Sequence, residues 1–172
     1  VLVEHCYFAG KTGDNDDVEL YGESSLYGLP HPVVRNNLFD VPAYDDRIHP
    51  TRCSALIYGN ILLGSTDHAI VLRDTCCPIV FNNLIYPIDS NYRFPSGGIT
   101  IQNGCDALIV NNTIIGVNSA IKLFDHRDRI NEPYCLSALS GRATVINCVI
   151  WNGDNAIDVS GNSGAPFTEF RV

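Results

Sequence analysis

A short segment built around adjacent asparagines recurs along the chain and limits the folds that are open to it. The segment "ALIVNNTIIG" has close counterparts in "PVVRNNLF", "ALIYGNIL" and "PIVFNNLI". Less regular copies are "VLVEHCYF" near the start and "ATVINCVI" near the end. The six copies begin at Val1, Pro32, Ala55, Pro78, Ala107 and Ala143. A short period that is lengthened only by insertions indicates a solenoid.

A shorter alternating stretch follows each copy. It reads "DVEL" at Asp17, "AIVL" at Ala69, "GITI" at Gly98, "AIKL" at Ala120 and "AIDV" at Ala156. In the second repeat we assign this role to "RIHP" at Arg47, which puts Ile48 in the apolar column. Apolar alternation in both stretches is typical of β-strands. The sequence therefore predicts an all-β chain with strand, turn, strand, turn in each repeat. This is a parallel β-helix of about six coils stacked ~4.8 Å apart.

The asparagines occupy one column of this repeat. Asn37, Asn60, Asn83 and Asn112 align, and Cys6 and Cys148 stand at the two ends of the column. Stacked identical residues can form an amide ladder along the axis. Asparagine also tolerates the left-handed backbone that turns a chain at a corner. We expect a ladder that stabilises the fold and takes no part in function.

Composition narrows the function classes. With 172 residues, 45% of them hydrophobic, the chain is expected to form one domain, residues 1–172. Because it begins and ends within the repeat pattern, we expect it to be a segment of a longer protein with covalent neighbours. A net charge of −8 argues against a nucleic-acid partner. No apolar run reaches the ~20 residues of a membrane span, so membrane insertion is not expected.

Three of the seven cysteines align in the repeat. Cys53, Cys76 and Cys105 each stand two residues before their copy of the segment, which predicts a vertical stack of buried thiols. Neighbouring coils place Cα atoms within disulfide range, but parallel side-chain directions disfavour the bond. Cys77 and Cys135 lie in predicted loops and are expected to be the more easily oxidised.

Acidic residues gather before the second strand of the first three repeats. One column contains Asp45 and Asp67, and the next contains Asp16, Asp46 and His68, with Asp17 beside them. Carboxylates one coil apart repel one another unless a proton, a cation or a donor intervenes. Paired acids suit glycoside hydrolysis, and an oxygen-rich site suits calcium, for which Asp45 and Asp67 are the candidates. The alternative is that these residues only form turns at the corners.

Other residues suggest contact with a sugar. Tyr44, Tyr92 and Phe94 lie in two insertions at the same corner and could stack on sugar rings, or could simply cover the coil edge. A second polar cluster follows the second strand and includes Arg73, Asp74, Gln102 and Asn103. Lys122 is predicted to point outward near this cluster. A basic residue there could act as the base of a lyase, with calcium acidifying the substrate. We take Tyr44, Tyr92, Phe94 and Lys122 as candidate substrate-binding residues.

The units "VNNTIIG", "FNNLIY", "YGNILLG" and "INCVIWNG", with their following "AIxL" strands, resemble the right-handed parallel β-helix superfamily, the pectate-lyase-like group. The resemblance covers all six repeats and implies a right-handed, single-stranded parallel β-helix. Members of this group include polysaccharide lyases, glycoside hydrolases, phage tailspikes and non-catalytic surface proteins, so fold does not choose an activity.

The stretch "GDNDDVEL" also resembles the G-D-D-containing strand of polygalacturonase-type hydrolases, although the chain has no G-H-G motif. This resemblance implies that the catalytic residues are Asp16, Asp17, Asp46 and His68. The expectation is an extracellular or cell-surface module that is structural or binds polysaccharide. The alternative is a polysaccharide-degrading enzyme, a glycoside hydrolase rather than a lyase, that uses the acidic corner.

Overall fold

The computed structural model describes residues 1–9, 16–22, 31–40, 45–64, 67–74, 76–87, 97–124, 141–159 and 170–171. All regular elements in these ranges are β-strands, which pair in parallel into three sheets. In the same ranges no helix is long and apolar enough to cross a membrane.

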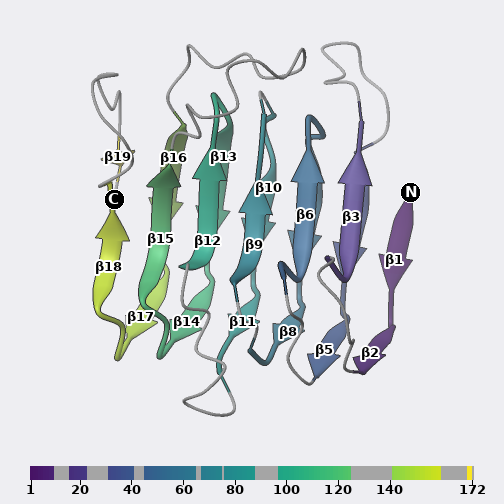
Figure 1. Ribbon diagram of the computed structural model, residues 1–172, viewed down its shortest axis with the longest axis horizontal. Helices are drawn as coiled ribbons and strands as arrows, with labels where there is room; N and C mark the ends of the chain where they lie inside the picture. The colour runs from purple at the N-terminus through teal and green to yellow at the C-terminus, as the bar shows by residue number, and fades with distance from the viewer. Residues whose placement is uncertain are drawn as a thin grey trace.

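Each sheet takes one strand from every coil (Figure 1). The first sheet contains β1 (Leu2–Glu4), β4 (Val33–Arg35), β7 (Leu56–Tyr58), β10 (Ile79–Phe81), β13 (Asp106–Val110), β16 (Arg142–Ile146) and β19 (Phe170–Arg171). The second contains β2 (Tyr7–Ala9), β5 (Leu38–Asp40), β8 (Ile61–Leu62), β11 (Leu84–Ile85), β14 (Thr113–Ile115) and β17 (Val149–Trp151). The third contains β3 (Val18–Tyr21), β6 (Ile48–Thr51), β9 (His68–Leu72), β12 (Gly97–Gln102), β15 (Ser119–Phe124) and β18 (Asn155–Asp158).

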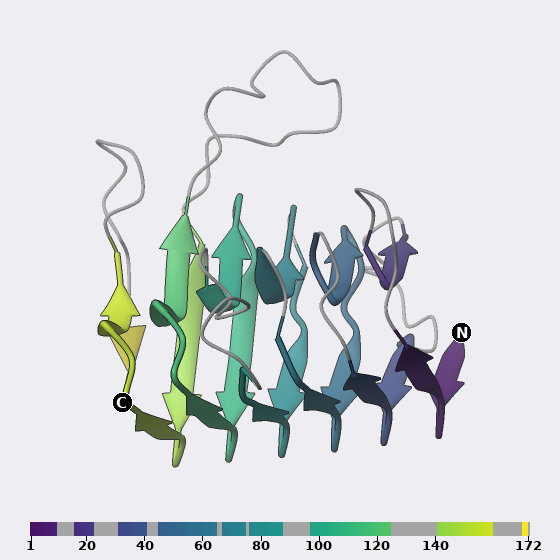
Figure 2. The same cartoon turned by 60° about the horizontal axis from the view of Figure 1, so that its bottom comes forward.

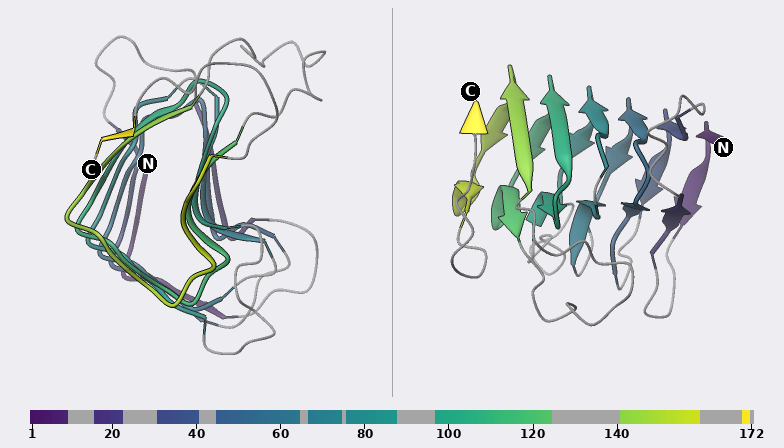
Figure 3. Two further views of the ribbon diagram at one scale, coloured as in Figure 1. Left: turned by 90° about the vertical axis from the view of Figure 1, so that its left-hand side faces the viewer. Right: turned by 90° about the horizontal axis from the view of Figure 1, so that it is seen from above.

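The chain passes through the first, second and third sheets in turn and then repeats the circuit, so the fold is a parallel β-helix of about six coils. Seen along the axis, the coils lie almost on top of one another (Figure 3, left). Figure 2 shows the same strands as rows that run from the N-terminal to the C-terminal coil. The all-β solenoid predicted from the repeat is therefore confirmed.

The number of strands in each coil differs from the prediction. The segment around the asparagines was expected to be one strand, but it bends and supplies one strand to the first sheet and one to the second. The residue at the bend has a positive φ in every coil: 54° at His5, Asn36, Asn82 and Asn111, 50° at Asn147 and 65° at Gly59. The first asparagine of the pair thus turns the backbone, which a residue without β-branching tolerates best.

The second asparagine of the pair forms the predicted ladder. Asn37 Nδ2 donates to Asn60 Oδ1 at 3.0 Å, and the same bond joins Asn60 to Asn83 and Asn83 to Asn112, each at 3.0 Å. Each accepting Oδ1 also accepts a hydrogen bond from the backbone N–H of the preceding asparagine in the ladder. The ladder therefore satisfies side chain and backbone together in a buried corner, and it fixes the register of neighbouring coils.

Aliphatic columns fill the interior. Val80 pairs with Ile57 on one side and Ile109 on the other, and Ile109 pairs with Val145. These four side chains are buried, as predicted for one inward column. Phe39 is also buried and stacks on Phe8 with the ring centroids 4.4 Å apart. Such a core gives the outer faces a regular and rigid support.

Candidate functional site

The sheet register brings acidic and histidine side chains of three coils together. Asp16 and Asp46 stand two residues before the paired Val18 and Ile48, and His68 stands two residues before Ile70, which pairs with Ile48. The row therefore lies at the tails of the arrows β3, β6 and β9 in Figure 1. The predicted proximity of Asp16, Asp46 and His68 is present in the structure.

His49 joins this row from β6. Its Nδ1 lies 2.7 Å from Asp16 Oδ2 and 3.6 Å from Asp46 Oδ2. Because both neighbours are carboxylates, we assign the proton of the ring to Nδ1. The backbone N–H of Asp46 donates to the other oxygen of Asp16 at 3.2 Å, which fixes that carboxylate on the turn.

His68 lies between two further carboxylates. Its Nδ1 is 2.9 Å from Asp46 Oδ1 and 3.1 Å from Asp67 Oδ1. Burial lowers the pKa of His68, but the hydrogen bonds to Asp46 and Asp67 and the charges of both acids outweigh it and raise this pKa to about 9. His68 is therefore a cation at neutral pH. It balances negative charge in the cluster.

The environment of Asp45 favours the neutral form of its side chain, whereas that of His68 favours the charged form. Desolvation raises its pKa first, and the charges of Asp46, Asp16 and Asp67 raise it further. A carboxyl group whose pKa is raised by neighbouring acids is the pattern expected of a general acid. Asp67 is more exposed than Asp16 and Asp46, with 36% of its side chain accessible against 8% and 6%.

Asp17, which was expected to be catalytic, points to a different partner. Arg47 Nη1 donates to Asp17 Oδ2 at 2.6 Å, and both side chains are almost inaccessible. The Arg47 guanidinium also donates to the carbonyl oxygen of Gly64, from Nε at 2.7 Å and from Nη2. This arrangement is a buried, hydrogen-bonded ion pair that joins adjacent coils. It gives Asp17 a structural role.

Three groups of described residues could hold a divalent cation. Asp16, Asp45 and Asp46 bring one oxygen each to within 4.8 Å of the others, Asp46, Asp67 and His68 form a second such group, and Asp16, Glu19 and His49 form a third. The first is all oxygen, as calcium prefers. In the second, the proton of His68 would have to leave before a metal could bind. Asp45 and Asp67 thus belong to different groups, although they were predicted as one calcium pair.

The outward face of the third sheet continues from this cluster. The neighbours of His49 along the helix axis are Glu19 on one side and, on the other, Val71, Thr100 and Lys122. Val71 is buried outside the hydrophobic core. Three buried polar atoms on this face have no hydrogen-bond partner among the described residues: His49 Nε2, Thr51 Oγ1 and Thr100 Oγ1. Buried polar atoms are nearly always paired in native proteins, so three on one face need an explanation.

The other end of the same face carries polar pairs across coils. Arg73 Nε donates to Gln102 Oε1 at 2.9 Å. Lys122 Nζ lies 5.2 Å from the centroid of the Phe124 ring, within range of a cation–π interaction. Lys122 is thus on the outward face as predicted, and Phe124 beside it is a partly exposed aromatic ring.

The aromatic residues expected to contact a sugar, Tyr44, Tyr92 and Phe94, lie outside the described residues, and so does His126. The residues that sequence reasoning missed are His49, Thr51 and Thr100. Alternation within "RIHP" could have placed His49 on the outward face three residues after Asp46. No pattern in the sequence shows that its Nε2 lacks a partner.

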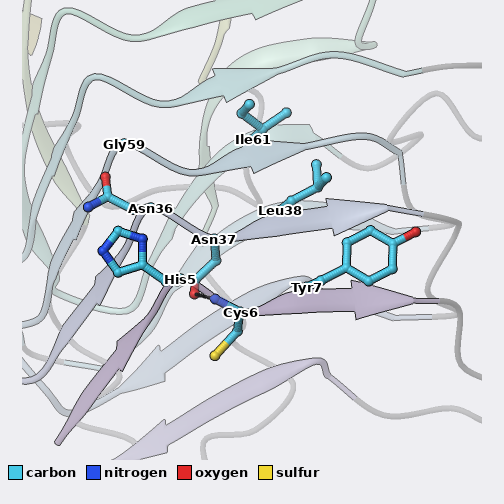
Figure 4. A pocket seen from close by; sticks show the side chains of 8 residues that line it. All are labelled: His5, Cys6, Tyr7, Asn36, Asn37, Leu38, Gly59 and Ile61. Carbon is cyan, nitrogen blue, oxygen red and sulfur yellow. Dashed lines mark hydrogen bonds between the residues drawn. The ribbon is translucent and has the colours of Figure 1, made fainter.

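A separate depression lies at the corner between the first and second sheets of the N-terminal coils (Figure 4). It has a volume of about 400 Å³ and is lined by His5, Cys6, Tyr7, Asn36, Asn37, Leu38, Gly59 and Ile61. Several of these are the bend residues and the ladder asparagine, which explains the shape of the surface. His5 is its only acidic or basic lining residue, so the acidic cluster and the outward face of the third sheet form the better candidate site.

Comparison of the chain with family models, with curated proteins and with solved structures finds no match.

Proposed function

We propose that this chain is a polysaccharide-binding β-helix module of an extracellular or cell-surface protein, related to the pectate-lyase-like superfamily. Its binding surface is the outward face of the third sheet. The observation that carries the proposal is a set of buried polar atoms on that face that find no partner in the described part of the chain: His49 Nε2, Thr51 Oγ1 and Thr100 Oγ1. Sugar hydroxyl groups both donate and accept hydrogen bonds, so one ligand class could satisfy an imidazole nitrogen and two threonine hydroxyls.

The surroundings of these atoms suit a chain of sugars. The face runs across successive coils, so residues recur at ~4.8 Å intervals along the direction in which an extended polymer would lie. Phe124 offers a ring on which a sugar can stack, and Lys122 beside it offers a cation. Arg73 adds a second positive group on the same face. These cations favour a glycan that contains carboxylate groups over a neutral one.

Because the three unpaired atoms are buried, a bound sugar reaches them only after this face opens locally. A ligand that holds this face open should change the hydrogen exchange of the amides in β6 and β12. The amides of β7 and β13, in the first sheet, should not change.

A panel of uronate-containing and neutral polysaccharides, tested by gel retardation with and without calcium, examines the proposal. We expect retardation by at least one uronate polymer and a several-fold loss of affinity in Lys122→Ala. Thr113→Val, in the second sheet, is the matched control and should bind as the wild type. If no polymer retards the wild-type protein, or if Lys122→Ala and the control bind alike, the outward face is not a sugar-binding surface.

A second candidate function is glycoside hydrolysis, which the environment of Asp45 favours. The pKa of Asp45 is raised, in part by the charge of Asp67, whose side chain is 36% accessible. One could protonate the glycosidic oxygen while the other activates water. Release of reducing ends from the bound polymer, abolished in Asp45→Asn and retained in the exposed Asp154→Asn, would establish an enzyme. Binding without release of reducing ends would leave the module non-catalytic.

A further inference from the structure

Two buried cysteines of adjacent coils lie unusually close together. Cys76 Sγ and Cys105 Sγ are 2.8 Å apart, although no disulfide joins them in the structure. This separation is shorter than two non-bonded sulfur atoms normally adopt, and it is less than 1 Å from the length of about 2.05 Å of a disulfide bond. From this contact we propose that Cys76 and Cys105 form a disulfide that staples the third coil to the fourth.

The backbone around the pair is regular enough to hold the bond. The N–H of Asp106 donates to the carbonyl oxygen of Cys76 at 2.8 Å, and the N–H of Arg142 donates to that of Cys105 at 2.7 Å. The two cysteines therefore occupy equivalent positions in one parallel ladder. Coil stacking puts their Cα atoms ~4.8 Å apart, inside the range of about 4.4–6.8 Å found in disulfides.

Turn length explains why Cys76 pairs with Cys105 and not with Cys53. Arg52, Asp74 and Asn103 occupy equivalent positions after the third sheet, and all have a positive φ, of 57°, 59° and 49°. Asp74 and Asn103 stand two residues before their cysteines, whereas Arg52 stands directly before Cys53. The turns that lead to Cys76 and Cys105 therefore match in length. Asn103 Nδ2 also donates to Asp74 Oδ1 at 2.9 Å and ties these two turns together.

The chemistry is a two-electron oxidation by a small disulfide, for which oxidised glutathione serves in the laboratory. The Cys76 thiolate attacks one sulfur of glutathione disulfide, whose S–S bond breaks and releases one glutathione thiolate. The Cys105 thiolate then attacks the Cys76 sulfur of this mixed disulfide and releases the second. The two cysteines lose two electrons, the oxidant gains them, and the two thiol protons end on the released glutathione.

Both thiols are almost completely inaccessible in the folded chain, and burial raises the pKa of Cys105 well above its usual range. Few thiolates are present there to react. The bond is therefore expected to form during folding, before the fourth coil closes over the third. Such a bond persists in oxidising compartments, so it also bears on where the protein matures.

Peptide mapping after refolding tests the bond directly. Unfolded protein is refolded with a mixture of reduced and oxidised glutathione, then unfolded in the presence of an alkylating agent and digested with trypsin without reductant. Cleavage after Arg73, Arg93 and Lys122 gives peptides 74–93 and 94–122. We expect these two peptides to be linked, with a mass two hydrogens below their sum. Because Cys77 shares the first peptide, the mapping is repeated in Cys77→Ser.

The expected result is the linked pair in the wild type, in Cys77→Ser and in the matched control Cys53→Ser, and its loss in Cys105→Ser. Two alkylated peptides from folded, oxidised protein would overturn the proposal, and so would a bond from Cys105 to Cys53 or Cys77. Circular dichroism confirms that each sample contains the β-helix. The pair lies at the turn before the first sheet, so a negative result leaves sugar binding by the third sheet untouched.

Discussion

Replacing Asn83 by leucine removes one member of the asparagine ladder while roughly keeping its volume. Asn83 Oδ1 accepts from both the backbone N–H and the side chain of Asn60, at 3.0 Å each. Its Nδ2 donates to Asn112 Oδ1 and to the carbonyl oxygen of Ile57, also at 3.0 Å each. Leucine can make none of these four bonds.

The loss can be assigned atom by atom. Asn60 Nδ2 keeps its bond to the carbonyl oxygen of Val34, and Asn112 Oδ1 keeps the backbone N–H at position 83. The backbone N–H of Asn60 loses its acceptor in a buried corner, and the Ile57 carbonyl oxygen loses a donor. An unsatisfied buried group costs about 1–3 kcal/mol, so Asn83→Leu should lower the free energy of unfolding by about 2–4 kcal/mol.

Chemical denaturation followed by circular dichroism measures this difference, with Asn82→Gly as the matched control. Asn82 is the exposed neighbour at the bend, with a φ of 54°, which glycine adopts readily. We expect the control to unfold within about 0.5 kcal/mol of the wild type. If Asn83→Leu is as stable as the control, the ladder does not hold the coils together.

Three further results are expected from the structure. The pKa of His68 is raised to about 9, so the stabilisation from its charge is fully present below the unfolded pKa of about 6.5 and is lost as the pH rises through 9. The melting temperature should therefore fall over this pH range, and His68→Gln should flatten the fall. Because the pKa of Asp45 is raised, folding disfavours its charged form, and Asp45→Asn should melt at a higher temperature than the wild type at pH 7. The difference should vanish below the unfolded pKa of about 3.9. A lower melting temperature of the variant at pH 7 would mean that the charge is stabilising. Phe39→Ala should lower the free energy of unfolding by about 3–5 kcal/mol because it empties a buried site against Phe8, and a loss below 1 kcal/mol in denaturant titration would show that the ring is not packed.

The columns of the β-helix could be predicted because the recurring asparagine sets the register of the coils. Once Asn37, Asn60, Asn83 and Asn112 are aligned, any residues at equal distances from them in the same turn stack across coils. That rule placed the inward aliphatic column. It also placed Asp16, Asp46 and His68 in one row, through the weak strand at Ile48.

The sequence did not predict details that depend on side-chain direction. The bend at Asn36 and its equivalents divides the segment between two sheets, and a run of strand-forming residues does not show where the backbone turns. Asp17 and Asp16 are adjacent acids, yet one pairs with Arg47 and the other with His49. Both residues lie just before β3, and their different directions become visible only when the neighbouring coil is in place.

The cysteine stack illustrates the same limit. Three cysteines at one offset predicted three equivalent thiols, and parallel side chains argued against a bond. The turn before Cys53 is one residue shorter than the turns before Cys76 and Cys105, so the three are not equivalent. The close approach of two sulfur atoms follows from matched turns, and the strand pattern alone does not contain that information.

We propose that a bound sugar contacts the polar atoms on the outward face of the third sheet that have no partner among the described residues. Thr100→Val tests this proposal, because valine keeps the shape of the side chain and removes only the hydroxyl group. Denaturation and polysaccharide titration are measured on the same two proteins. We expect the variant to be more stable by about 1 kcal/mol, since a buried unpaired group is removed, and to bind the polysaccharide several-fold more weakly. A variant that is less stable than the wild type and binds equally well would show that the hydroxyl has a partner within the protein, and would contradict the claim.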